Sequence, residues 1–280
     1  MSQLIRLGIS TCPNDTFAFH GLMNRDVDWQ GLEFQIELLD IQLLNDGLFA
    51  NRFDVAKTSF HAALLLSDRY VVLPSGSALG FGVGPLLLAA KPGQSPSDAG
   101  QRVLCPGRHT TATLLFNLFY PNTATVQHAV FSEIMPALQS RKADFGVCIH
   151  EGRFTWQDEG LALVEDLGTR WEAETSCPLP LGGLVASRNL SRETMSVAQS
   201  VIQASILFAR ENPESTIPTM RKYAQEFDDE VLMKHVSLYV NDWTVDLGDE
   251  GSRSLQQLSS QAKSVGLIDE CQPSLEIFKP

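Results

Sequence analysis

Residues 144–155 read DFGVCIHEGRFT, a short apolar strand that stops on a histidine, an acid and an arginine. Open α/β folds place their binding and catalytic groups in the crevice outside the carboxyl ends of such strands. There His150 can titrate near neutral pH, while Glu151 and Arg153 set its protonation and hold an anionic substrate. The alternative is a histidine held in a turn by hydrogen bonds, and the local sequence does not decide between the two.

On both sides of this stretch, short apolar runs alternate with amphipathic helical segments, which is typical of βαβ units. The N-terminal part predicts strands at 4–10, 33–39, 54–58 and 71–73 and helices at 16–24, 42–51 and 60–67. A second series predicts strands at 102–105, 125–129 and 145–149 and helices at 110–119 and 131–143, with Ser132 as the N-cap of the last helix. After a polar irregular stretch we expect a strand at 183–186 and helices at 192–211, 213–225, 229–240 and 251–265.

Two segments divide this pattern. Residues 75–85 concentrate glycine and predict a hinge or a bent strand lining a cleft, since their spacing fits no phosphate-binding loop. Residues 92–100 are rich in Pro, Gly and Ser, as domain linkers are. The order predicts a large lobe of residues 1–88 plus 187–280 and a small α/β lobe of residues 89–186. This is the layout of the two-lobed periplasmic-binding-protein-like (type II) fold, an α/β fold with mixed sheets flanked by helices and a cleft between lobes.

Composition narrows the class of protein. Hydrophobic residues make up 44% and charged residues 19% of the 280 residues, which is typical of soluble globular proteins. The formal net charge of -12 would repel a phosphate backbone, so an anionic ligand needs a local cation or a helix N-terminus. No run approaches the roughly 20 apolar residues that span a bilayer, and residues 1–10 read as a strand rather than as a secretory signal. We expect a cytoplasmic protein with neither nucleic acid nor membrane as partner.

The cysteines and the remaining histidines predict no metal site. The five cysteines are scattered and form no CxxC pair, so neither a disulfide framework nor a zinc site is indicated. Cys105 and Cys148 lie in apolar runs and are expected to be inert core thiols. No metal-binding spacing joins the other histidines, which we interpret as helix-surface or core residues: His20, His61, His109 and His128. A catalytic triad is not indicated either, because there is no GxSxG elbow.

Three further segments could meet His150 in one crevice, because each ends a strand or opens a helix. Asp15 stands at a helix start, where a helix cap and a ligand contact are both open. Lys57, followed by Ser59, is a charge inside an apolar strand that needs an anionic ligand or a carboxylate as its partner. Thr110-Thr111-Ala112 opens a helix whose N–H groups and hydroxyls suit a carboxylate, with simple capping as the alternative.

Five motifs follow one another in an order seen in one enzyme family: STCPNDTFAFH at 10–20, DVAKTSF at 54–60, GSALGFGVGP at 76–85, PGRHTTA at 106–112 and ADFGVCIHEGRFT at 143–155. The chain resembles the 1,4-dihydroxy-6-naphthoate synthases of the futalosine route to menaquinone, over roughly residues 4–190. Thr11 is a small departure, since serine is expected there, and a hydroxyl is retained.

The resemblance implies a cofactor-free lyase that converts cyclic dehypoxanthinyl futalosine to 1,4-dihydroxy-6-naphthoate and dihydroxyacetone. It implies His150 as the catalytic base and places Ser59 and the Thr110–Ala112 segment against the substrate. The chemistry suits Glu151 as a group that orients His150, with Lys57 or Arg153 offsetting developing negative charge.

Two rival functions stay open at this point. One is chorismate dehydratase, an enzyme of the same pathway, and the other is a solute-binding protein that only closes on a small anion. A ligand-sensing module is a weaker alternative, because no DNA-binding helical motif is evident. The sequence leaves the oligomeric state open, with a homodimer as one arrangement.

Overall fold

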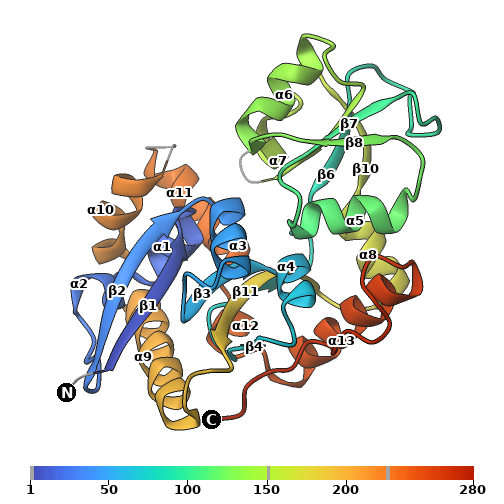
Figure 1. Ribbon diagram of the computed structural model, residues 1–280. Helices are drawn as coiled ribbons and strands as arrows, with labels where there is room; N and C mark the ends of the chain where they lie inside the picture. The colour runs from blue at the N-terminus through green and yellow to red at the C-terminus, as the bar shows by residue number, and fades with distance from the viewer. Residues whose placement is uncertain (1–2, 150–151, 225–227) are drawn as a thin grey trace.

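The computed structural model describes residues 3–149, 152–224 and 228–280, and these form two lobes, each built around its own sheet (Figure 1). The first sheet has the order β2-β1-β3-β11-β4, with β5 also paired to β11. Its strands are β1 (Gln3–Ser10), β2 (Leu32–Leu39), β3 (Val55–Ser59), β4 (Tyr70–Val72), β5 (Ala78–Gly80) and β11 (Leu179–Ser187). The second sheet has the order β10-β6-β9-β7-β8. Its strands are β6 (Leu86–Ala89), β7 (Arg102–Cys105), β8 (Thr125–His128), β9 (Phe145–Cys148) and β10 (Ala162–Asp166).

Both sheets are mixed. β1 runs parallel to β2 and β3, whereas β11 runs antiparallel to β3, β4 and β5. In the second sheet β7 is parallel to β8 and β9, and β6 is antiparallel to β9 and β10. The parallel pairs place the carboxyl ends of β1 and β3 at one edge, facing the other lobe (Figure 1). The predicted α/β fold with mixed sheets flanked by helices is therefore confirmed.

Helices cover both sheets. The N-terminal helices are α1 (Pro13–Ala18), α2 (His20–Asn24), α3 (Ile41–Phe49) and α4 (Phe60–Leu65). The second lobe carries α5 (Thr111–Phe119), α6 (Phe131–Gln139), α7 (Gly152–Thr155) and α8 (Leu167–Thr175). The C-terminal helices are α9 (Arg192–Glu211), α10 (Pro213–Tyr223), α11 (Asp229–Tyr239), α12 (Asp242–Val245) and α13 (Gly248–Ser264). None of the helices in the described ranges is both long and apolar enough to cross a bilayer.

Three local expectations are wrong. The single helix expected at 16–24 is two short helices, because Phe19 leaves helical geometry with a ψ of 6°. Ser132 does not cap α6, whose N-cap is Val130. The stretch expected to be irregular holds β10 and α8, and Asp166 caps α8 by accepting from the N–H groups of Gly168 and Thr169.

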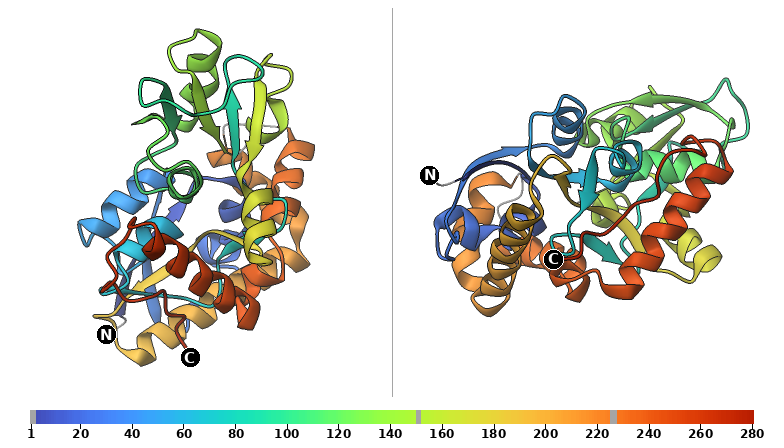
Figure 2. Two further views of the ribbon diagram at one scale, coloured as in Figure 1. Left: turned by 90° about the vertical axis from the view of Figure 1, so that its right-hand side faces the viewer. Right: turned by 60° about the horizontal axis from the view of Figure 1, so that its bottom comes forward.

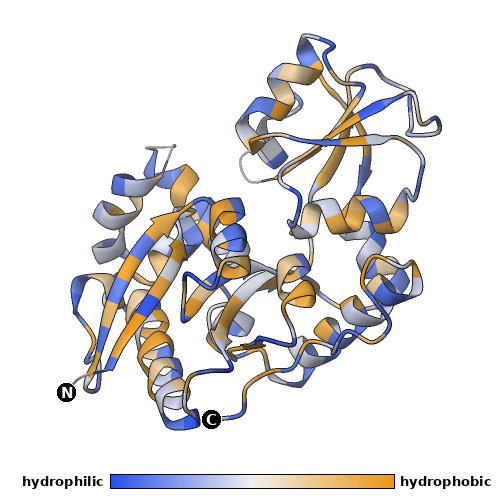
Figure 3. Ribbon diagram, viewed as in Figure 1, coloured by the Kyte–Doolittle hydropathy of each residue, from blue (hydrophilic) through white to orange (hydrophobic). Residues whose placement is uncertain are grey.

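The apolar core continues from one lobe into the other. Strand interiors in both lobes carry hydrophobic residues, while the outer helix faces are hydrophilic (Figure 3). One cluster joins Phe60 of α4, Phe116 of α5, Trp171 of α8 and Leu255 of α13, all buried. The views in Figure 2 show α13 beside α5 and α8 at the junction of the lobes. The lobes are therefore packed together on one side and separated on the other.

Two chain crossings join the lobes, one between β5 and β6 and one between α8 and β11. Gly84 of the first crossing meets Gly168 at the start of α8: a Cβ on either glycine would overlap the backbone of the other. Only glycine allows this approach of two backbones. The lobe boundaries expected at 88/89 and 186/187 stay a prediction.

Candidate functional site

A cavity lies where the two lobes face each other, with about 770 Å³ of empty space that is in part open solvent. Its walls come from the carboxyl ends of β1 and β3, the start of α5, segment 83–85, and Ile149 at the end of β9. It brings together every described residue that the sequence nominated: Asp15, Lys57, Ser59, Thr110, Thr111, Ala112 and Arg153. His150 and Glu151 lie outside the described residues. A wider hollow continues the cavity outward and shares Cys12, Ile41 and Ile149 with it.

Lys57 and Asp15 form a buried ion pair in the cavity wall. Lys57 Nζ donates to Asp15 Oδ1 at 2.6 Å and to the carbonyl of Gly76 at 2.8 Å, and both charged side chains are 5% exposed. Lys57 is central in β3, so its charge would be costly without such a partner. Asp15 makes no cap at the start of α1, so the capping alternative is wrong for this residue.

A buried asparagine fixes Ser59. Asn45 of α3 accepts hydrogen bonds from the Thr58 hydroxyl at 2.8 Å and the Ser59 N–H at 3.0 Å, and its Nδ2 donates to Ser59 Oγ at 3.2 Å. Gly182 of β11 passes beside this turn, where a Cβ would stand 2.6 Å from the Thr58 carbonyl. The end of β3 is therefore held on both sides, and the Ser59 hydroxyl has a fixed position at the cavity.

At the start of α5 the two threonine hydroxyls already have partners. Thr110 is the N-cap and accepts from the Thr113 N–H at 3.3 Å. Thr111 Oγ1 donates to the carbonyl of Leu181 in β11 at 2.5 Å, which joins the two lobes. The first N–H groups of an α-helix have no intrahelical acceptor. What α5 offers to a ligand is thus its backbone at Thr111 and Ala112, rather than a pair of hydroxyls.

Arg153 of α7 is also paired. Its guanidinium donates to Asp166 Oδ2 at 2.7 Å and to the Gly84 carbonyl, at the point where the chain crosses between lobes. The two side chains are 17% and 19% exposed. Arg153 lines the cavity, yet its charge is largely matched by Asp166. A ligand carboxylate would meet a shared cation here rather than an unpaired one.

The neighbouring histidines are held neutral. Burial lowers the pKa of His61 to about 4, against a smaller raising effect of its hydrogen bond to the Thr110 carbonyl. Burial also lowers the pKa of His109 and of His128. The thiols of Cys105 and Cys148 are buried, and burial raises the pKa of each to about 12, as expected for unreactive core residues.

Sequence reasoning missed the cavity residues that come from the C-terminal helices. His235 and Tyr239 of α11 line the cavity together with Asn14 of α1. A signal was present, because Leu232, His235, Val236 and Tyr239 fall on one buried stripe of α11. A histidine in such a stripe is a candidate for a buried polar contact, but nothing local indicates which lobe or site it faces.

Comparison with known proteins agrees with this geometry. Residues 5–264 match the family described as menaquinone biosynthesis. A protein of Thermus thermophilus named "1,4-dihydroxy-6-naphtoate synthase" is 39% identical over 265 residues, covering 95% of this chain and 96% of the relative. A protein of the same name from Streptomyces coelicolor is 35% identical over 283 residues, covering 99% of both chains.

Solved structures confirm the fold. A crystal structure of a protein from Archaeoglobus fulgidus superimposes with a TM-score of 0.88 at 34% identity, covering 95% of this chain and 98% of that one. The periplasmic aliphatic sulphonate binding protein SsuA from Escherichia coli gives a TM-score of 0.65 at 11% identity, covering 96% and 90%, which shows a common fold alone. The periplasmic-binding-protein-like architecture expected from the sequence is therefore correct. By the match over residues 5–264 and two near-full-length relatives, the chain belongs to the menaquinone biosynthesis family.

Proposed function

We propose that this chain is a cytoplasmic 1,4-dihydroxy-6-naphthoate synthase, a carbon–carbon lyase that converts cyclic dehypoxanthinyl futalosine to 1,4-dihydroxy-6-naphthoate and dihydroxyacetone. One structural observation supports this proposal in addition to the names of the relatives. Residues from all five motifs of the resemblance, separated by up to 143 positions from Ser10 to Arg153, line one interlobe cavity. A binding site assembled from those motifs is what a shared substrate requires.

Carbon–carbon cleavage that leaves an aromatic ring needs a base to remove a proton and donors to hold the oxyanion that develops. We assign the base to His150, supported by its sequence neighbours Ile149 and Arg153, which both line the cavity. Glu151 orients this base in the proposal. The reaction is a rearrangement of bonds with no net oxidation, so the proposal includes no redox cofactor.

The substrate carboxylate is assigned to the start of α5. Lys57 is already neutralised by Asp15, and Arg153 by Asp166, so neither cation is a free counter-charge. Thr111 and Ala112 line the cavity, and the first N–H groups of α5 carry the positive end of the helix dipole. Lys57 and Arg153 then stabilise the negative charge that appears on the substrate during bond cleavage. As this charge grows, their hydrogen bonds, which Asp15 and Asp166 accept in the free protein, shift toward the substrate.

Closure of the two lobes would remove water from the cavity and strengthen these contacts. The decisive experiment incubates the purified chain with cyclic dehypoxanthinyl futalosine, without added metal or nucleotide, and follows naphthoate absorbance. Turnover supports the proposal. If the chain turns over chorismate instead, it is the dehydratase. If it binds either compound saturably without forming product, it is a binding protein.

A further inference from the structure

His235 of α11 lies in the cavity wall and is 3% exposed. Its ring packs against Tyr239 with centroids 4.7 Å apart, and its neighbours on the buried stripe, Leu232 and Val236, belong to an apolar cluster with Phe17. A histidine among such residues is unfavourable unless its nitrogens are bonded. His235 Nε2 lies 3.1 Å from Asn14 Oδ1.

The hydrogen bonds of Asn14 have a defined direction. Asn14 Nδ2 donates to Asp15 Oδ1 at 3.1 Å, and the same oxygen accepts from Lys57 Nζ at 2.6 Å. A rotated amide would place its oxygen against a carboxylate oxygen, which is repulsive. The amide oxygen therefore faces His235, and Nε2 is the ring nitrogen that carries the proton. The bonds run from His235 to Asn14, and from Asn14 to Asp15.

We propose that His235 is a positioning residue, which fixes the Asn14 amide and through it the Asp15–Lys57 pair at the cavity wall. A buried ion pair keeps its geometry only if its remaining hydrogen-bonding positions are filled. Without the donor at Nε2 the Asn14 amide is free to rotate, and Asp15 then loses one of its donors. The inference rests on the proposed function only where turnover is measured.

Two substitutions separate positioning from packing. Gln at 235 keeps an N–H donor near the place of Nε2 but removes the aromatic ring, whereas Phe keeps the ring and removes the donor. If His235 positions the pair, His235→Phe lowers kcat about tenfold through misplacement of the charged groups, while His235→Gln stays within about threefold of the unaltered chain. KM changes less than kcat in His235→Phe, because the proposed carboxylate site belongs to α5. If His235 only fills space, the order is reversed, and His235→Phe keeps a higher kcat than His235→Gln.

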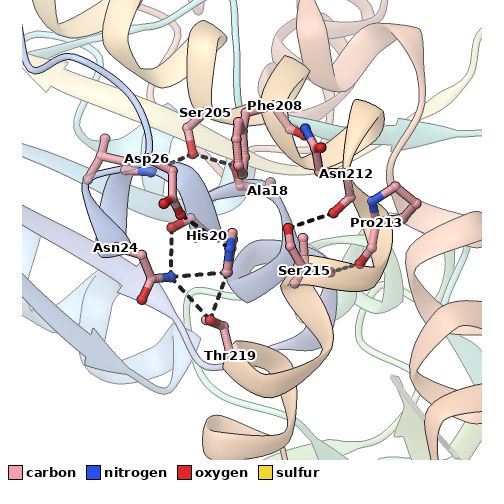
Figure 4. Close-up of polar contacts among 12 residues, drawn as sticks. Ala18, His20, Asn24, Asp26, Ser205, Phe208, Asn212, Pro213, Ser215 and Thr219 are labelled. Carbon is pink, nitrogen blue, oxygen red and sulfur yellow. Dashed lines mark hydrogen bonds and ion pairs between the residues drawn. The ribbon is translucent and has the colours of Figure 1, made fainter.

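A matched control is available in His20 of α2. It is also buried, its Nδ1 lies 2.8 Å from Thr219 Oγ1, and it stacks on Phe208, but it lies among α2, α9 and α10 rather than in the cavity (Figure 4). His20→Phe should leave kcat within about twofold, since sites without shared partners act independently. Thermal melts of every variant show whether it is folded.

The double variant His235→Phe/Asn14→Leu tests the connection itself. If His235 acts through Asn14, the double variant is no slower than Asn14→Leu alone, because the two changes remove one series of contacts. Effects that multiply, or a His235→Phe enzyme faster than His235→Gln, overturn the proposal. ¹⁵N NMR of the histidine rings gives a readout that does not depend on turnover: a proton on Nε2 supports the proposal and a proton on Nδ1 alone overturns it. If the unaltered chain shows no turnover, the proposed function fails while this readout still decides the role of His235.

Discussion

Single side chains set the chemistry of this cavity through charges that are paired before any ligand arrives. The ammonium of Lys57 and the carboxylate of Asp15 are almost fully buried, and the guanidinium of Arg153 is bonded to Asp166. In a chain of net charge -12, unpaired cations would be the simplest way to attract an anion. In the proposed mechanism, this pairing leaves recognition of the substrate carboxylate to a helix N-terminus and leaves the cations to stabilise charge that develops during the reaction.

Removing one partner of the buried Lys57–Asp15 pair should lower the stability of the protein more than removing both partners. Lys57→Met leaves an uncompensated Asp15, and we expect a loss of about 3 kcal/mol in the free energy of unfolding. Lys57→Met/Asp15→Leu should recover part of that stability, because no charge stays buried, yet neither variant should turn over substrate. Urea unfolding curves provide the measurement. A Lys57→Met protein as stable as the unaltered chain would contradict this account of the pair.

His150→Ala tests the proposed base directly. General-base catalysis contributes about 10² to 10⁴ in rate, so we expect kcat to fall by at least 10²-fold. Substrate binding, measured by calorimetry, should change little, because the proposed carboxylate site lies on α5. Turnover close to that of the unaltered chain would remove His150 from the mechanism.

At the scale of elements, local patterns predicted most of the fold. β7 (Arg102–Cys105) and α9 (Arg192–Glu211) have the bounds that the sequence predicts, because apolar spacing and flanking residues mark their ends. β10 and α8 were missed, since β10 is only half-buried and pairs on one side alone, so its sequence lacks a clear alternation. Asp166, the cap of α8, is a local sequence signal for the start of that helix.

The candidate site was predictable only where its residues end a strand or open a helix. Asp15, Lys57 and the start of α5 were found in this way and do line the cavity. Their partners were not, because the pairing of Arg153 with Asp166 and the approach of His235 to Asn14 depend on how distant elements pack. Strand ends can be read from local sequence, whereas contacts over 221 positions cannot.

The contact between α4 and α5 should make stability depend on pH. The pKa of His61 is about 4 in the folded protein and about 6.5 when unperturbed, so below pH 6.5 the unfolded chain binds a proton that the folded chain does not. The neutral His61 side chain therefore contributes about 3 kcal/mol to the free energy of unfolding. This contribution is fully present above pH 6.5 and is lost as the pH falls through 4. His61→Asn, whose Nδ2 can still donate to the Thr110 carbonyl, should flatten the decline. Urea unfolding at pH 7, 6 and 5 measures this pH dependence. If the free energy of unfolding falls equally with pH in both proteins, His61 is not its cause.

At the scale of the whole molecule, we expect the close contact between the first crossing and the start of α8 to restrict the angle between the lobes. Gly84→Ala would force its methyl group into the backbone of Gly168, a clash that a flexible side chain cannot relieve. We expect a destabilisation of about 2 kcal/mol or more, together with a changed angle between the lobes. Small-angle X-ray scattering with and without substrate measures the angle.

Gly100→Ala is the matched control for this change, because its Cβ would meet only the Asp98 carboxylate, at 3.4 Å from Oδ1 and 4.0 Å from Cγ. Its stability should stay within about 0.5 kcal/mol of the unaltered chain. If Gly84→Ala and Gly100→Ala have the same stability and the same angle between the lobes, the close approach of Gly84 to Gly168 is not required.

The hydroxyl of Thr111, bonded to the Leu181 carbonyl, ties the beginning of α5 to a strand of the opposite sheet. We therefore expect the carboxylate site proposed at the start of α5 to stay attached to the larger lobe when the lobes close. In that case the site is complete before closure, and the substrate is bound before it is enclosed.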